Sequence, residues 1–383
     1  MKRIITLVVL ALILSACSQT ATSTPTIPAL VTVAPPTVSA PIVSAPAFTA
    51  IHMIDVMNGW AITDTGVVRT NDGGATWHNV TPSGVTKLGY GTTFYFLDSN
   101  HGWVVSGNNQ SDPPTGTLYR TQDGGATWQS GAVNFFMGNM VFVNASNGWM
   151  MASLSVAMGS NAVAVFQTTD GGATWKQTYV NDPNQPGAAT TLPLGGLKDG
   201  ITPTDMNNAW IGGITYADGV IYLYQTQDGG QTWKLQPLQI PAGYEQAQFE
   251  TVGPQFATAT DAYLPVHFTN QYGMLMSVYY SHDGGANWAL TPMMIPNGGS
   301  MNFVSATDGF VWNGTDFYVT HDGAKTWTTV SPGVAFGDNF AGMDFISTTT
   351  GFVLTNDTHT VILYKTMDGG ATWTEISNAT IGQ

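Results

Sequence analysis

Seven copies of one eight-residue motif run through this chain and constrain its fold more than any other feature. The motif reads Ser/Thr-x-Asp-Gly-Gly-x-Thr-Trp, with a single change in two of the copies, and successive aspartates lie 39 to 58 residues apart. A period of this length with strand-like flanks is typical of a radial repeat architecture. The copies occupy residues 70–77, 121–128, 168–175, 226–233, 281–288, 320–327 and 366–373.

A second motif alternates with the first and completes each repeat. It is a turn of Asn, Asp or Gly followed by an aromatic, apolar strand, as in residues 100–105 (NHGWVV). With the apolar stretches around it, each repeat predicts four strands, a to d, in which the Asp-Gly-Gly motif turns strand c into strand d. Four antiparallel strands make one propeller blade. The sequence therefore predicts an all-β fold, a seven-bladed β-propeller of four-stranded antiparallel blades.

The repeated aspartates and tryptophans are expected to be structural. Asp can accept hydrogen bonds from its own turn, and glycine permits positive φ in a tight hairpin. A tryptophan at a fixed place in every blade favours packing between blades, so we expect Trp128→Ala to cost several kcal/mol. The structural set is Asp72, Trp77, Asp123, Trp128, Asp170, Trp175, Asp228, Trp233, Asp283, Trp288, Asp322, Trp327, Asp368 and Trp373.

The N-terminus predicts an export signal and a lipid anchor. Lys2 and Arg3 precede an apolar run that is too short to span a bilayer comfortably. Small residues then lead to Cys17, the only cysteine, in a pattern that resembles a bacterial lipobox. We expect a signal peptide at 1–16, lipidation of Cys17, a Pro/Thr/Ala-rich linker at 17–47 and the propeller at 48–383. The protein would then be extracytoplasmic and anchored to the cell membrane.

Charge and composition narrow the partners. The chain has 24 acidic and 10 basic residues, which makes nucleic acid an unlikely partner. No histidine or carboxylate cluster has the spacing of a zinc or calcium site, so no metal and no cofactor is expected. The expected partner is a protein or a glycan, bound by a monomer.

Loop lengths predict which face of the propeller binds. The a–b and c–d turns are nearly constant, whereas the b–c and d–a loops vary, and in a four-stranded meander these variable loops share the face opposite the Asp-Gly-Gly turns. Variable loops on a rigid scaffold commonly carry binding residues. The longest are 179–200 and 236–256. The candidate binding residues are Asp182, Asp199, Tyr244, Glu245, Glu250, His267 and Tyr272.

The repeat resembles the Asp-box, or bacterial neuraminidase repeat, and covers essentially all of 48–383. The alternation of Gly-aromatic strands with Asp-boxes, as in 98–103 followed by 119–128, is most similar to the photosystem II assembly-factor repeat family. That resemblance implies a propeller that acts as an assembly or binding scaffold. Sialidases share the repeat, but their carboxylate-binding triad needs three arginines. Beyond the signal segment this chain has only Arg69 and Arg120, which occupy the same place in two repeats.

Two functions remain open from the sequence. The favoured one is a non-enzymatic binding scaffold for a protein or glycan, with no catalytic residues. The alternative is a glycoside hydrolase or sugar-binding propeller, because a Glu and Asp pair at the mouth of the channel could act as acid and base.

Overall fold

A computed structural model describes residues 40–88, 91–108, 115–270 and 273–381. The chain divides into two compact units, Met1–Pro35 and Pro36–Gln383, and every described residue belongs to the second. The expected signal peptide, Cys17, most of the linker and the candidate residue Tyr272 lie outside the described residues. No helix in the described part is long and apolar enough to cross a membrane.

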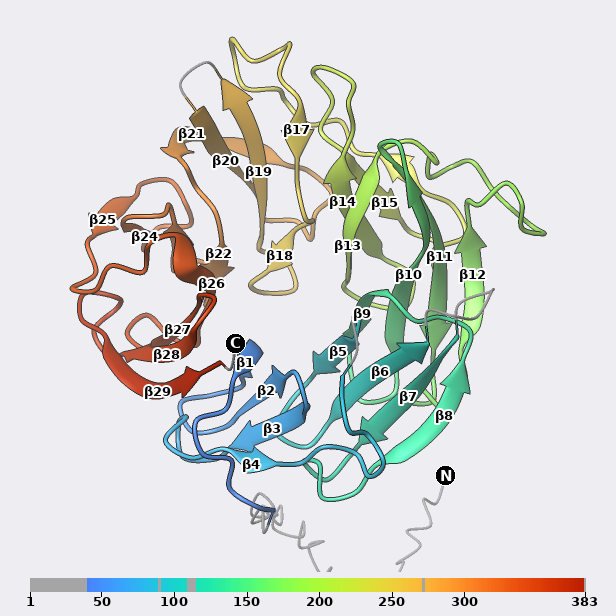
Figure 1. The fold of residues 1–383 in the computed structure, drawn as a ribbon. Helices are drawn as coiled ribbons and strands as arrows, with labels where there is room; N and C mark the ends of the chain where they lie inside the picture. Colours follow the sequence, from blue (N-terminus) through green and yellow to red (C-terminus); the bar gives the residue numbers. More distant parts are fainter. Residues whose placement is uncertain (1–39, 89–90, 109–114, 271–272, 382–383) are drawn as a thin grey trace, which may run out of the picture. The chain divides into compact units, whose positions relative to one another are not determined.

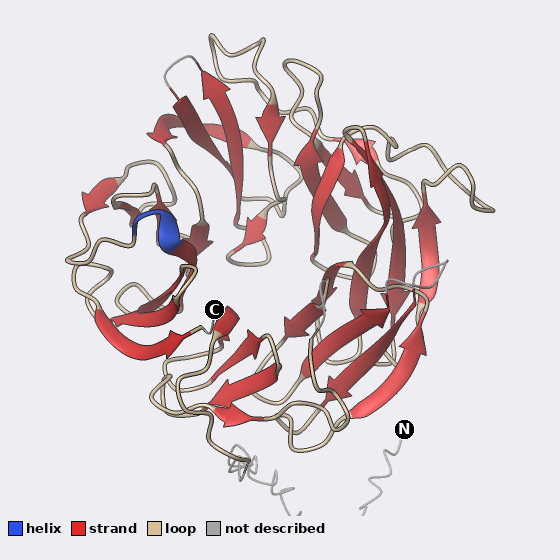
Figure 2. Ribbon diagram, in the orientation of Figure 1, coloured by secondary structure: helices blue, strands red, loops and turns tan. Residues whose placement is uncertain are grey.

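The described residues form antiparallel β-sheets arranged as a propeller, with one short 3-10 helix at Gly337–Asn339 (Figures 1 and 2). Five sheets have four strands each and follow chain order. Their strands are β1 (Phe48–Met53), β2 (Gly59–Thr63), β3 (Gly66–Thr70) and β4 (His78–Asn79); β5 (Thr93–Phe96), β6 (Gly102–Asn108), β7 (Thr115–Thr121) and β8 (Gln129–Val133); β9 (Gly138–Phe142), β10 (Gly148–Ala157), β11 (Ser160–Thr168) and β12 (Lys176–Val180); β22 (Met301–Phe303), β23 (Gly309–Trp312), β24 (Phe317–Thr320) and β25 (Thr328–Val330); and β26 (Phe340–Phe345), β27 (Gly351–Asn356), β28 (Thr360–Thr366) and β29 (Thr374–Thr380).

The fourth and fifth repeats share one nine-stranded sheet, which corrects the expectation of seven separate four-stranded blades. Five sheets are separate, and the sixth holds the strands of both repeats. Its strands are β13 (Leu197–Pro203), β14 (Ala209–Ile214), β15 (Leu223–Thr226), β16 (Lys234–Leu235), β17 (Phe249–Glu250), β18 (Gln255–Phe256), β19 (Ala262–Asn270), β20 (Gly273–Ser281) and β21 (Ala289–Pro296).

The short strand β17 joins the two halves of this sheet. Glu250 is the register partner of His267 on β19 and also of Ile214 on β14, so β17 lies between the second strands of two repeats. β18 pairs with the other end of β19. Pro254 lies between β17 and β18, and because proline has no N–H to donate, it interrupts the strand. The first strand of the fifth repeat is thus split, and its first piece reaches the neighbouring repeat.

The ring closes through side chains and not through an exchanged strand. β1 pairs with β2, so the N-terminal strand begins the first repeat and does not complete the last. In Figure 1 the first and last sheets, blue and red, lie next to each other. Across this junction the Met53 N–H donates to Asp344 Oδ2 at 2.6 Å, and Lys365 Nζ donates to the carbonyl of Gly73 at 3.3 Å.

The hydrophobic core lies between neighbouring repeats. The described residues contain seven buried apolar clusters, and each draws side chains from two adjacent repeats, including the last and the first. The aromatic side chain of the second strand stacks on the first strand of the next repeat: Trp103 lies 3.6 Å from Phe142 and Tyr263 lies 3.5 Å from Phe303, measured between ring centroids. Burial between repeats therefore holds the sheets together.

The tryptophans of the Asp-box motif are buried to different extents: Trp77, Trp233 and Trp373 are buried, and the other four are partly buried. Trp60, Trp103, Trp149 and Trp210 are at most 1% exposed. Trp128 does lie between repeats, because its Nε1 donates to the carbonyl of Val80 at 2.7 Å, but its side chain is only partly buried. All four second-strand tryptophans are thus fully buried, whereas Trp128 is one of the Asp-box tryptophans that are not.

Each Asp-box closes its turn with the same hydrogen bonds. In all seven copies the first Ser or Thr hydroxyl donates to the Asp Oδ1 at 2.8–2.9 Å, and the backbone N–H four residues after the Asp donates to the same oxygen at 2.8–2.9 Å. These bonds favour the charged carboxylate and lower the pKa of every Asp-box aspartate. The aspartates are fully engaged in turn formation.

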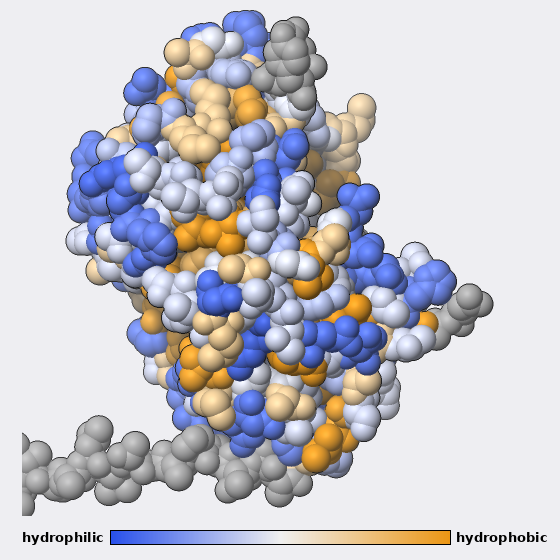
Figure 3. Space-filling model, turned by 90° about the vertical axis from the view of Figure 1, so that its left-hand side faces the viewer, coloured by the Kyte–Doolittle hydropathy of each residue, from blue (hydrophilic) through white to orange (hydrophobic). Residues whose placement is uncertain are grey.

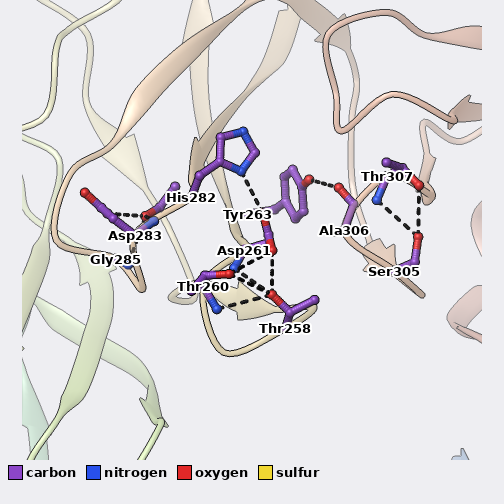
Figure 4. Close-up of polar contacts among 11 residues, drawn as sticks. Thr258, Thr260, Asp261, Tyr263, His282, Asp283, Gly285, Ser305, Ala306 and Thr307 are labelled. Carbon is purple, nitrogen blue, oxygen red and sulfur yellow. Dashed lines mark hydrogen bonds and ion pairs between the residues drawn. The ribbon is translucent and has the colours of Figure 1, made fainter.

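Figure 4 shows polar contacts on the Asp-box side of the fifth repeat, one of which joins this repeat to the sixth. Asp261 accepts a hydrogen bond from the Thr258 hydroxyl at 2.6 Å and lies 2.7 Å from His282 Nδ1. Tyr263 points toward the sixth repeat and donates to the carbonyl of Ala306 at 2.5 Å. The polar side chains drawn in Figure 4 therefore form hydrogen bonds with one another and with the backbone.

Candidate functional site

A cavity lies against the innermost strands of four successive repeats, and we call it the inner cavity. Its volume is about 870 Å³. Strands β13, β18, β22 and β26 contribute to its wall, together with β19 and the segment that joins β17 to β18. It is lined by Thr202, Pro203, Glu250, Val252, Gly253, Pro254, Gln255, Phe256, Pro265, His267, Met274, Gly298, Gly299, Ser300, Met301, Gly342 and Met343.

Glu250 and His267 are the two titratable residues of this lining. They lie opposite each other on β17 and β19, and the Glu250 side chain is exposed while His267 is partly buried. Burial lowers the pKa of His267, although the backbone at Gly299 and the charge of Glu250 act in the other direction. The His267 Nε2 has no hydrogen-bond partner among the described residues. This nitrogen is buried, so His267 contributes an unpaired polar atom to the wall beside Glu250.

Asp199 on β13 adds a second carboxyl to this region. The surrounding protein and the charge of Glu250 raise the pKa of Asp199 to about 6, although solvent still reaches the side chain. The neighbouring Lys198 turns away, since its Nζ is held by backbone carbonyls, the nearest being that of Leu194 at 2.8 Å. Among the described residues neither Asp199 nor Glu250 forms an ion pair. Two carboxyls thus repel each other without a nearby compensating cation.

The other candidate binding residues are placed elsewhere. Asp182 accepts hydrogen bonds from the backbone and side chain of Asn184, so it closes its own loop. Glu245 accepts from the Gly243 N–H at 3.0 Å. The Tyr244 ring packs edge-on against Phe268 at 4.8 Å. The structure therefore brings Asp199, Glu250 and His267 together and leaves these three in separate loop contacts.

Gly212 allows the chain that lines the inner cavity to come close, and nothing in the sequence around Gly212 predicts this role. A Cβ on Gly212 would lie 2.3 Å from the Gly253 nitrogen and 2.6 Å from the Thr251 carbonyl oxygen. The chain between β17 and β18 can approach β14 only because no side chain stands there. Its path is held on the other side by Thr251, whose hydroxyl donates to the carbonyl of Pro265 at 2.6 Å.

The lining of the inner cavity is negatively charged on one side, at Glu250, as in a binding site for a basic group. Its lining carries a single carboxylate, one histidine and no lysine or arginine, and the rest is apolar or backbone. Within the described part of the chain no three His, Cys, Asp or Glu side chains are grouped as metal ligands. By contrast, the surface of the sixth and seventh repeats seen in Figure 3 mixes polar and small apolar areas. The inner cavity, with its volume of about 870 Å³, is a concave feature large enough for a ligand.

Comparisons with known proteins support the repeat and the fold. The family model described as BNR/Asp-box repeat matches residues 279–290. The structure is similar to "YCF48 bound to D1 peptide", with 16% identity, a TM-score of 0.53, and 85% of this chain and 96% of that one covered. It is also similar to a protein from Lactobacillus plantarum, with 13% identity, a TM-score of 0.51, and 87% and 98% covered.

A GH74 xyloglucanase from Xanthomonas campestris gives a TM-score of 0.60 at 12% identity, with 88% of this chain covered. This chain spans only 55% of that enzyme. No curated protein matches the sequence. At these identities the similarities establish the propeller fold and leave the activity open.

Proposed function

We propose that this protein is a non-enzymatic binding scaffold, anchored by lipid at Cys17 on the extracytoplasmic side of the membrane, which works as a monomer and holds a protein segment in the inner cavity. The basic start, the apolar run and the lipobox-like residues before Cys17 support the anchor. The proline-rich stretch up to residue 47 would then act as a spacer between the membrane and the propeller.

The observation that carries the proposal is the uncompensated pair Asp199 and Glu250 at a cavity with an apolar wall. A basic side chain of a bound segment would relieve the repulsion between these carboxyls, while its aliphatic part would contact Phe256 and Met301. Net charge −14 would attract such a segment before contact. The similar structure of YCF48 bound to D1 peptide supports a protein ligand.

Binding of fluorescent peptides tests this function. The probes are a peptide library with one central lysine or arginine and the same library with norleucine or citrulline there. We expect the basic peptides to bind more tightly, and Glu250→Gln to weaken them about ten-fold, the effect of one hydrogen bond to a charged group. Glu375→Gln is the matched control, because Glu375 is an exposed glutamate on β29 away from the cavity. Equal affinity for both libraries would overturn the proposal. An equal loss of peptide affinity in Glu250→Gln and Glu375→Gln would also overturn it.

The anchor and the monomeric state have separate readouts. Cys17→Ser should move the protein from the membrane pellet to the soluble fraction, and unchanged membrane retention would contradict lipid anchoring. Light scattering of the chain in detergent should give the mass of one copy, and a dimer mass would contradict the monomer.

One observation favours a second candidate function, hydrolysis of a glycan. A carboxyl with its pKa raised to about 6 beside a second carboxylate is the arrangement that glycoside hydrolases use for acid and base. Purified protein incubated with plant and envelope polysaccharides would then release reducing ends, with activity falling above pH 6 as Asp199 loses its proton. Loss of that release in both Asp199→Asn and Glu250→Gln would favour the enzyme, and no release from any polysaccharide would remove it.

A further inference from the structure

A second, smaller cavity lies between the third and fourth repeats on the face of the variable loops. Its volume is about 340 Å³. It is bounded by the β10–β11 turn at Gly159, by the loop before β13 at Pro193 and Gly196, and by the β14–β15 loop at Tyr216. These strands lie side by side in green in Figure 1. We call it the loop-face cavity, and it shares no lining residue with the inner cavity.

The floor of the loop-face cavity is fixed by a buried lysine. Lys198 is 5% exposed, and its Nζ donates to the carbonyls of Leu194 at 2.8 Å, Gly196 at 3.0 Å and Asn161 at 3.1 Å. The Gly196 N–H also donates to the Gly159 carbonyl at 3.0 Å. One ammonium thus ties the loop before β13 to the third repeat. These hydrogen bonds restrain the loop, which limits the entropy lost when a ligand binds.

The wall of the loop-face cavity is aromatic and uncharged. Tyr216, Tyr222 and Tyr224 line it, and its lining contains no Asp, Glu, Lys, Arg or His. Tyr216 is 56% exposed, and its ring packs on Gly159, where a Cβ would come within 2.5 Å of the ring. The ring is therefore set in place beside the opening while much of its surface stays accessible.

Tyr222 carries an unused polar group at this wall. Its side chain is 3% exposed, and its hydroxyl has no hydrogen-bond partner among the described residues. Its ring lies 4.8 Å from that of Tyr224 and also faces Lys198, whose Nζ is 5.7 Å from the ring centroid. Buried hydroxyls in proteins are normally paired, so an unpaired one at a cavity wall points to a missing partner.

We propose that the loop-face cavity binds one ring of a neutral sugar. The apolar C–H face of a sugar would lie on the accessible Tyr216 ring, and a sugar hydroxyl would pair with the Tyr222 hydroxyl. The lining itself carries no charge, and the nearby Lys198 ammonium is already held by backbone carbonyls, so an acidic or an amino sugar would find no free counter-charge. A purely apolar ligand would leave the Tyr222 hydroxyl unpaired. A cavity of about 340 Å³ lies at the small end of ligand sites, which fits one sugar ring.

Titration calorimetry of the full chain with cellobiose, maltose, xylobiose and mannobiose tests the proposal. At least one disaccharide should bind, and glucuronic acid and glucosamine dimers should bind more weakly than it. Tyr216→Ala should weaken binding about ten-fold, because it removes the stacking ring. Met367→Ala is the matched control, since Met367 is an exposed apolar side chain in the Asp-box of the last repeat.

Tyr222→Phe separates binding from structure. The Tyr222 hydroxyl has no partner to lose, so the change should leave the melting midpoint unchanged or raise it. Its sugar affinity should nevertheless fall about five-fold, the effect of one neutral hydrogen bond. Absence of binding by all four disaccharides, or binding that is unchanged in both tyrosine variants, would overturn the proposal. Glu250→Gln should leave sugar binding unchanged, so failure of the proposed function and failure of this site are distinguishable.

Discussion

Replacing Trp103 with alanine should be among the most destabilising single changes in this protein. The side chain is 1% exposed, stacks on Phe142 of the next repeat at 3.6 Å, and donates from Nε1 to the carbonyl of Gly171 at 2.9 Å. Large aromatic-to-alanine changes in protein cores cost about 3–5 kcal/mol. The Gly171 carbonyl keeps a second donor, Arg120, at 3.3 Å, so the lost hydrogen bond adds little. We expect a loss of about 4 kcal/mol in unfolding free energy.

Trp128→Ala is the comparison that tests this reasoning. Trp128 also lies between repeats but is only partly buried, so less apolar area and a smaller cavity are involved. We expect a loss of about 2 kcal/mol, roughly half that of Trp103→Ala. Urea unfolding followed by far-ultraviolet circular dichroism measures both, because most of the signal comes from the β-sheet backbone, which unfolds in both variants. Equal losses, or a larger loss for Trp128→Ala, would refute the view that second-strand aromatics hold the repeats together.

Three further changes probe the fold. Gly212→Ala would place a Cβ 2.3 Å from the Gly253 nitrogen, so it should lower the melting midpoint and weaken peptide binding together; an unchanged midpoint would contradict the close approach. Hydrogen bonds from the threonine four residues later lower the pKa of Asp322 to about 2 from 3.8, so its stabilisation is complete above pH 3.8 and is lost as pH falls through 2. The difference in melting midpoint between wild type and Asp322→Asn should therefore shrink from pH 5 to pH 2, and a constant difference would contradict this. Asp344→Ala removes the acceptor of the Met53 N–H, so it should cost about 1–3 kcal/mol in urea unfolding, whereas no change would show that this contact does not help close the ring.

The local structure of this protein can be predicted from its residue types. The Asp-box is a turn of eight residues whose hydrogen bonds join neighbours in the chain, as between Ser281, Asp283 and Asn287, so its residue types specify it directly. Strand direction follows from the turn before each Gly-aromatic strand, and the repeat period determines that the sheets form a propeller. The sequence also identified both long loops that contribute to the cavities, 179–200 and 236–256.

The contacts between residues that are distant in the sequence could not be predicted and are known from the fold. The charge of Glu250 on β17 helps to raise the pKa of Asp199 on β13, although the two residues lie far apart in the sequence and in different repeats. Their meeting depends on β17 reaching Ile214, which Gly212 permits by lacking a side chain. The unpaired hydroxyl of Tyr222 could not be predicted from the sequence either, because it depends on which side chains pack around the ring. Turn chemistry is local and leaves a pattern in the sequence, whereas the approach of one repeat to the next depends on packing, and packing leaves no periodic signal.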